Sequence, residues 1–182
     1  MIAPGSAPPA VPIGRADLPE PTETGQLARL AIELLTASGR TVAVAESLTG
    51  GLVTGALTTV AGASLAVRGG VVAYATELKT ALLGVPADLL ARQGPVDPDV
   101  AAAMAEGVRR RLGATYGLAT TGVAGPGPAD GKPQGTVFVA VAGPADISYR
   151  GLELTGNRQE VREQTVRWAL SLLVRALRED GD

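Results

Sequence analysis

The sequence predicts a single α/β domain of three layers, in which helices cover both faces of a largely parallel, mixed sheet of about five strands. Three observations lead to this prediction. Segments of strand character alternate with segments of helical periodicity, which is typical of a parallel sheet covered by helices. Two consecutive strand-like segments near the C-terminus would add an antiparallel part. Aromatic residues are only 3% of the chain, so the core must consist of Ala, Val and Leu, which favours close packing of helices on a sheet.

The N-terminal segment differs from the rest of the chain. Residues 1–22 contain six of the 13 prolines and show little periodicity, a composition that favours extended or disordered chain. We therefore expect a tail over residues 1–22 and the folded domain over residues 23–180. From Thr24, apolar residues at helical spacing predict a helix that ends near Gly39, and residues 41–45 (TVAVA) predict the first strand.

The middle of the chain alternates between helical and extended patterns. Asp97 followed by Pro98 is typical of a helix start, because the Asp side chain caps free N–H groups and proline suits the first helical position. The elements expected here are a small-residue helix ending near Gly62, a strand over 70–75, a short helix over 76–84, a helical turn after Pro86 and a helix from Asp97 to about Gly113.

The C-terminal third predicts three strands and the longest helix. The strands are expected over 116–121, 136–142 and 147–154, and Asn157 is expected to cap the closing helix. Ligands of such sheets bind beyond the carboxyl ends of the strands. The candidate site therefore involves the loops over 46–51 and 121–135. One face of the closing helix is expected to carry Val161, Thr165, Ala169, Leu172, Leu173 and Ala176.

The composition excludes several kinds of chemistry. The chain has no cysteine and no histidine. Disulfides, thiolate nucleophiles, iron–sulfur clusters and Ser-His-Asp triads are therefore excluded, and we expect no metal site and no cofactor. All basic residues except Lys79 and Lys132 are arginines, which do not release a proton at ordinary pH. A catalytic base would have to come from these two lysines, the tyrosines, the carboxylates or water.

Charge and hydropathy narrow the choice of partners. A net charge of -2 indicates no nucleic-acid partner, and Arg109, Arg110 and Arg111 are interpreted as a solvated helix end. Residues 47–67 carry no charge, but ten of them are Gly, Ser or Thr, which favours a tightly packed helix over a membrane span. The N-terminus has no secretory pattern, so we expect a cytoplasmic protein. Small apolar residues favour a homo-oligomer, with a dimer preferred.

Two motifs place nucleophile and base candidates after strands. In AESLTGG (45–51), Ser47 lies on a strand-to-helix turn, where helix N–H groups stabilise an oxyanion. The alternative is a simple helix cap, and the motif is not the G-x-S-x-G nucleophile elbow. In GVVAYATELK (70–79), Tyr74 lies near a strand end and Lys79 in the next helix. They are candidates for the base, and the alternative is a packed tyrosine with a solvated lysine.

Two further motifs contain groups that are suited to binding an anion. The loop TTGVAGPGPADGKPQG (120–135) is glycine-rich, so that its N–H groups can converge on a phosphate, although it matches no nucleoside-triphosphate loop. The alternative is an ordinary mobile loop. In TGNRQEVR (155–162), Arg158 and Arg162 lie four residues apart and would share one helix face, suited to a phosphate or carboxylate. The alternative is a capped helix with solvated Glu and Arg side chains.

Together with KPQGTVFVA (132–140), these motifs resemble, in order and spacing, the CinA C-terminal domain family, which includes nicotinamide-nucleotide amidases. The similarity covers about residues 25–178 and corresponds to the stand-alone form of the family. It implies hydrolysis of the carboxamide of nicotinamide mononucleotide to nicotinate mononucleotide and ammonia. It also implies that Ser47 is the nucleophile and that Tyr74 and Lys79 activate it. Leu48 and Val123 depart mildly from the family pattern.

The substrate, a pyridine nucleotide, is expected to contact both loops and the start of the closing helix. A different class of function remains open, namely a non-catalytic competence- or DNA-damage-associated protein that binds a nucleotide or another protein through the same cleft. An enzyme acting on another amide is a third possibility. The residues predicted to bind the substrate are Thr49, Gly50, Gly51, Thr121, Gly122, Gly125, Arg158 and Arg162.

Overall fold

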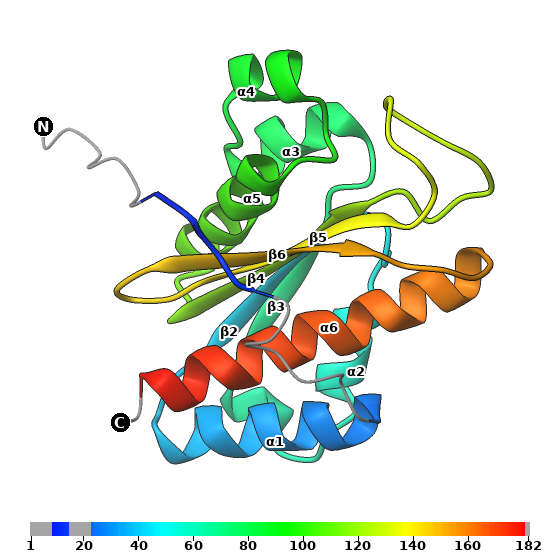
Figure 1. The fold of residues 1–182 in the computed structure, drawn as a ribbon. Coiled ribbons are helices and arrows are strands. Elements are labelled where there is room, and N and C mark those ends of the chain that lie inside the picture. The colour runs from blue at the N-terminus through cyan, green and yellow to red at the C-terminus, as the bar shows by residue number, and fades with distance from the viewer. Residues whose placement is uncertain (1–8, 15–22, 181–182) are drawn as a thin grey trace, which may run out of the picture.

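A computed structural model describes residues 9–14 and 23–180 of the chain, and the rest of the predicted tail lies outside the described residues. Its strands form one sheet in the order β1-β6-β5-β4-β2-β3 (Figure 1). β2 pairs in parallel with β3 and β4, β6 pairs in parallel with β1, and β5 is antiparallel to both of its neighbours. The strands are β1 Val11–Pro12, β2 Val42–Glu46, β3 Val67–Val72, β4 Tyr116–Gly122, β5 Thr136–Ala142 and β6 Ile147–Glu153.

Helices cover both faces of the sheet. One face carries α1, α2 and α6, and the other carries α3, α4 and α5 (Figure 1). The predicted three-layer α/β class with a mixed sheet is therefore confirmed. The helices are α1 Thr24–Ala37, α2 Leu52–Thr58, α3 Thr76–Leu83, α4 Ala87–Gln93, α5 Pro98–Arg111 and α6 Arg158–Glu179, and a short 3-10 turn spans Ala63–Leu65.

The core has one apolar cluster on each face of the sheet. Along β2, Val42 and Val44 belong to the cluster under α1 and α6, whereas Ala43 and Ala45 belong to the cluster under α5. This alternation follows from the two-residue period of a strand. The alanine-rich face lets α5 approach closely: a Cβ on Gly117 of β4 would lie 1.9 Å from the carbonyl oxygen of Ala105. Small residues thus set the separation of helix and sheet.

Three elements differ from the sequence prediction. β1 lies within the predicted tail and adds a sixth strand to the sheet. The sequence did not predict it, because a strand of two residues is too short to show a hydrophobic period. β3 begins at Val67 and ends at Val72, where its partner β2 also ends, rather than extending over 70–75. α2 ends at Thr58, before the 3-10 turn that leads into β3. The two predicted caps are present, since Asp97 accepts from the N–H of Asp99 and Asn157 forms a capping box.

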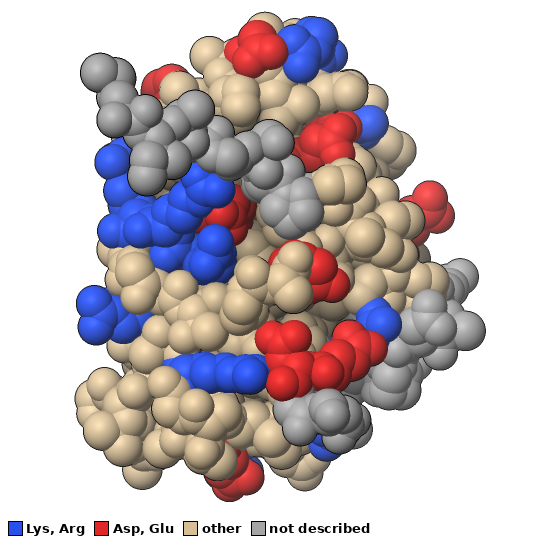
Figure 2. Space-filling view, turned by 90° about the vertical axis from the view of Figure 1, so that its left-hand side faces the viewer, with Lys and Arg blue, Asp and Glu red and all other residues tan. Residues whose placement is uncertain are grey.

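Many charged side chains on the surface form ion pairs or hydrogen bonds with neighbouring residues. Arg109 and Arg110 of α5 both form ion pairs with Glu106. Arg111 donates to the carbonyl oxygens of residues 81 and 82 at the end of α3. The view in Figure 2 shows basic side chains gathered mainly on one side, with acidic side chains next to them, on a largely uncharged surface. No helix within residues 9–14 and 23–180 is long and apolar enough to cross a membrane.

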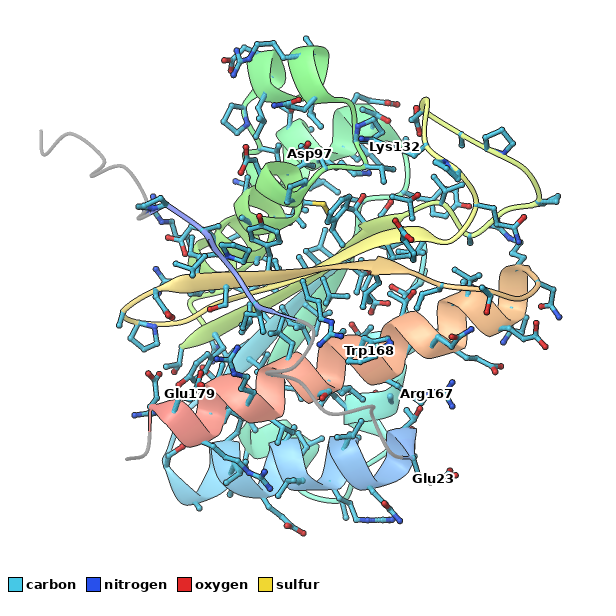
Figure 3. The ribbon with its side chains drawn as sticks, in the orientation of Figure 1. Glu23, Asp97, Lys132, Arg167, Trp168 and Glu179 are labelled. Carbon is cyan, nitrogen blue, oxygen red and sulfur yellow. The ribbon has the colours of Figure 1, made fainter. Side chains whose placement is uncertain are left out.

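α6 contacts the sheet near its middle and at its C-terminal end. Near its middle, Trp168 lies below the sheet (Figure 3), where the guanidinium of Arg150 stacks 4.1 Å from the ring. At its C-terminal end, the Tyr116 hydroxyl donates to the carboxylate of Asp180 and accepts from Arg40 at 2.8 Å. Burial, followed by the hydrogen bond to Asp180, raises the pKa of Tyr116 to about 12.

Replacing Tyr116 with phenylalanine should lower the free energy of unfolding by about 1 kcal/mol at neutral pH, because a buried hydrogen bond is lost. The raised pKa adds a pH signature. The folded state retains the phenol proton above pH 10, so this stabilisation is present below pH 10 and is lost as the pH rises through about 12. Urea unfolding of wild type and Tyr116→Phe at several pH values measures both effects. Tyr149→Phe on β6 is the matched control, and equal pH profiles for Tyr116→Phe and wild type would contradict the prediction.

Candidate active site

A cavity of about 260 Å³ opens at the carboxyl ends of β2 and β4. It is lined by the turn after β2, the start of α3 and the glycine-rich loop after β4. The loop extends past the same end of the sheet at which α6 begins (Figure 1). Both loops that the sequence predicts at the site therefore contribute to one cavity. Of the predicted site residues, it is lined by Ser47, Tyr74, Lys79, Thr121, Gly122, Gly125 and Arg158.

Ser47 and Lys79 are in direct contact in this cavity. The Lys79 Nζ donates to the Ser47 Oγ at 3.2 Å and to the Ala73 carbonyl oxygen at 3.0 Å. Only 1% of the Lys79 surface is exposed. Burial lowers the pKa of this lysine, and the nearby charges of Asp130 and Glu77 oppose the effect without cancelling it. The amine is thus shifted toward its neutral form, in which it is able to accept a proton from the serine.

The sheet brings these two residues together. Ser47 follows β2, and its N–H donates to the Thr120 carbonyl oxygen of β4, which continues the ladder by one residue. β3 ends beside β2, so that the chain enters α3 at Thr76 close to this serine. Lys79 lies one turn into α3. Parallel pairing of β2 and β3 therefore places two residues that are 32 positions apart at the same edge.

Glu46 holds the turn that carries Ser47, and the sequence analysis did not identify it. Its fully buried carboxylate accepts from the backbone N–H groups of Gly51, Val53 and Thr54 and from the Thr54 hydroxyl. A carboxylate is favourable at this position, since the N–H groups at a helix start lack partners and carry partial positive charge. Gly51 has a φ of 100°, a left-handed conformation that favours glycine and lets the chain turn into α2.

We expect Glu46→Gln to reduce the free energy of unfolding by about 2 kcal/mol, because an amide cannot accept on both sides as the carboxylate does. The turn at Ser47 would lose its order as well, so any catalytic turnover should fall. Denaturant unfolding gives the first quantity and an activity assay the second. Glu33→Gln on the exposed face of α1 is the matched control. Unchanged stability of Glu46→Gln would contradict the prediction.

The two arginines of the TGNRQEVR motif have different surroundings. Arg158 bridges the cavity mouth, because it donates to the Tyr74 hydroxyl at 2.7 Å and to the Gly125 carbonyl oxygen. Arg162 instead donates to the carbonyl oxygens of Leu48 and Thr49, at 3.0 and 2.9 Å, and thereby holds the serine turn. Arg158 lines the cavity, whereas Arg162 does not. Tyr74 is 57% exposed, so its position is at the mouth.

Of the remaining predicted substrate-binding residues, some line the cavity and others lie only in the turn that carries Ser47. Thr121 lines the cavity, and its hydroxyl donates to the Pro95 carbonyl oxygen at 2.7 Å. Thr49, Gly50 and Gly51 lie in the serine turn and do not line the cavity. The Leu48 N–H, next to the nucleophile candidate, has no hydrogen-bond partner in the part of the chain that the structure describes. It is therefore a candidate donor to an oxyanion.

Gln134 is a second residue that the sequence analysis did not single out. Its side chain accepts from the Gly127 N–H at 3.1 Å and donates to the Gly156 carbonyl oxygen at 2.8 Å. It thus connects the glycine-rich loop to the turn before α6. A Cβ on Gly125 would lie 2.4 Å from this side chain. Among the described residues, no group of three or more acidic residues could hold a metal ion.

Comparison with known protein families gives a match over most of the chain. The family model of the CinA C-terminal domain matches residues 24–177. The chain belongs to the CinA C-terminal domain family. The resemblance inferred from the five motifs is therefore confirmed, and the catalytic serine and lysine candidates both lie within the matched range.

Curated relatives and solved structures support the assignment. This CinA domain is 56% identical over 144 residues to a CinA-like protein from Frankia casuarinae (79% of this chain, 33% of the relative). It is 51% identical over 144 residues to a CinA-like protein from Gemmatimonas aurantiaca (78% and 34%). The chain spans about a third of the length of these curated relatives.

The solved structures match nearly their whole length. The competence/damage inducible protein CihA from Agrobacterium tumefaciens has a TM-score of 0.82 at 38% identity, with coverage of 87% of this chain and 97% of that one. A CinA superfamily protein from Escherichia coli has a TM-score of 0.82 at 30% identity, with coverage of 89% and 96%. The CinA domain thus shares its fold with these proteins over 87% and 89% of its chain.

Proposed function

We propose that this CinA domain hydrolyses the carboxamide of nicotinamide mononucleotide, giving nicotinate mononucleotide and ammonia. The observation that carries the proposal is the buried contact between the Lys79 amine and the Ser47 hydroxyl at the wall of a cavity. A serine with a desolvated lysine is a known pairing of nucleophile and base. It suits a chain without histidine. The substrate itself is taken from the family resemblance.

In the first half-reaction the Ser47 Oγ attacks the amide carbon while its proton passes to the Lys79 amine. The Ala73 carbonyl oxygen accepts one N–H of this amine, which helps to orient the nitrogen lone pair. The proposed donor to the negative oxygen of the tetrahedral intermediate is the N–H of Leu48, the residue that follows Ser47 in the chain. Lys79 then transfers the proton to the amide nitrogen, the C–N bond breaks, and ammonia leaves an ester on Ser47.

In the second half-reaction water hydrolyses this ester. Lys79 accepts a proton from the attacking water, and the second tetrahedral intermediate uses the same N–H donor. Collapse of the intermediate returns this proton to the Ser47 oxygen and releases nicotinate mononucleotide as a carboxylic acid, which then loses its proton to water. Both half-reactions thus use one base, and neither requires a metal ion or a redox step.

The other residues are proposed to bind and orient the nucleotide. Arg158 and Tyr74 lie at the mouth, where a phosphate could accept from the guanidinium. The N–H groups of Gly122 and Gly125 are proposed as further donors in the glycine-rich loop. Arg162 and Thr49 are proposed to stabilise the turn that carries Ser47, through the bond from Arg162 to the Thr49 carbonyl oxygen and the bond between the Thr49 and Thr120 hydroxyls.

The test is a product assay with the purified chain and nicotinamide mononucleotide. We expect ammonia and nicotinate mononucleotide in equal amounts, measured by a coupled ammonia assay and by chromatography. Binding of the nucleotide without product would instead support the non-catalytic class of function. Release of ammonia only from another pyridine or nucleoside amide would support the amidase activity but assign it a different substrate.

A further inference from the structure

Asp130 lies at the tip of a hairpin within the glycine-rich loop. Ala129 and Lys132 exchange two backbone hydrogen bonds of 3.1 and 2.9 Å, so that Asp130 and Gly131 form a two-residue turn. Their φ angles of 50° and 71° are both positive, as a type I′ turn requires. Asp and Asn are the non-glycine residues that best tolerate this conformation. The turn therefore determines where the Asp130 side chain projects.

Asp130 lines the same cavity as the proposed catalytic pair. Asp130 is the one acidic residue among the described residues that line the cavity. Its carboxylate forms no hydrogen bond or ion pair with another described residue. Its charge nevertheless acts on Lys79, whose pKa it raises against the larger lowering that burial causes. The negative charge thus lies within electrostatic reach of the reacting end of the cavity.

The lining of the same cavity also includes a positive charge, that of Arg158. Arg158 is at the mouth, where it contacts Tyr74 and the carbonyl oxygen of Gly125. Nicotinamide mononucleotide has the complementary order of charges. Its pyridinium ring is cationic and carries the carboxamide, and its phosphate is anionic and lies one ribose away. With the carboxamide at Ser47, the ring lies near Asp130 and the phosphate is able to extend toward Arg158.

We propose that Asp130 is a specificity-determining residue, whose carboxylate selects the cationic pyridinium ring of the substrate over an uncharged ring. This inference rests on the proposed function and deepens it, because it names the group that recognises the charge next to the scissile amide. The turn and the charge have separate requirements: asparagine satisfies the turn, and only aspartate supplies the charge.

The experiment compares two ligands that differ in the charge of the ring. Nicotinamide mononucleotide and its 1,4-dihydro form have the same carboxamide, ribose and phosphate, but the dihydro ring is neutral. Their Kd values are measured by calorimetry for Ser47→Ala, which prevents turnover, and for Ser47→Ala with Asp130→Asn. We expect Asp130→Asn to raise the Kd of the cationic ligand roughly fivefold to tenfold and the Kd of the neutral ligand by less than about twofold.

Asp146→Asn is the matched control, since Asp146 is an exposed aspartate between β5 and β6 that does not line the cavity. It should leave both Kd values unchanged. An equal loss for the two ligands with Asp130→Asn, or no loss for either, overturns this inference and leaves the amidase intact. Absence of ammonia release by the wild-type chain overturns the proposed function, and this inference with it.

Discussion

Ammonia release from nicotinamide mononucleotide is expected to fall by about four orders of magnitude or more when Ser47 is replaced with alanine. The Ser47 Oγ is the atom that forms the ester, so its removal leaves no covalent route. The fold should persist, because Ser47 contributes its backbone N–H to the sheet and alanine retains this bond. A discontinuous ammonia assay gives the rate, and circular dichroism with thermal unfolding checks the fold.

The control for this substitution is Ser64→Ala in the exposed 3-10 turn, which should leave the rate unchanged. Nucleotide binding offers a further check, because Ser47→Ala should bind the substrate with a Kd near that of the wild type. Activity within tenfold of the wild type in Ser47→Ala would contradict the assignment of the nucleophile. A folded variant that neither binds nor reacts would indicate that the serine acts in binding.

Replacing Lys79 with methionine should produce two effects of opposite sign. The rate should fall about 10²- to 10⁴-fold, the usual contribution of a general acid and base. Stability should rise at neutral pH. Burial lowers the pKa of Lys79, so the folded chain holds this proton less tightly than the unfolded chain, and stability is lost as the pH falls below the ordinary lysine pKa of 10.5. Methionine has similar length and no proton to lose, so this cost disappears.

Steady-state kinetics and thermal unfolding measure the two effects on the same samples. Lys79→Arg is the matched control, because arginine keeps the positive charge but does not act as a base at ordinary pH, and it should be inactive as well. In the wild type, kcat/KM should increase with pH through the lowered pKa of Lys79 and then level off, since only the neutral amine accepts the serine proton. Retained activity in Lys79→Met would assign the base to Tyr74 or another group.

The predicted members of the site differ in how well the sequence could resolve their roles. Ser47 and Lys79 were both predictable as candidates, because each follows a strand in a chain with few alternatives for nucleophile and base. The choice between Lys79 and Tyr74 was not, since it depends on which side chain reaches the serine. The structure brings the Lys79 amine to 3.2 Å from the Ser47 hydroxyl and leaves Tyr74 at the mouth with Arg158.

Residues that support the site were the hardest to predict. Glu46 and Gln134 form hydrogen bonds with backbone groups that become neighbours only when a turn closes. No periodicity or spacing in the sequence marks such a contact. Arg158 and Arg162 show the same limit: their spacing of four predicts one helix face, yet one guanidinium reaches the cavity and the other reaches the backbone of the serine turn.

The sequence by itself determined the α/β class, the family and the chemistry that the chain lacks, because these depend on composition, hydrophobic period and the order of local motifs. Only the tertiary structure decided the contact between Ser47 and Lys79, the hydrogen bonds between Glu46 and the start of α2, and the position of Asp130 at the cavity. The physical reason is that strand pairing joins segments distant in the chain, and burial then changes the protonation of what it encloses. The absence of histidine made Lys79 a candidate, and burial beside Ser47 lowers its pKa, as the proposed role of a base requires.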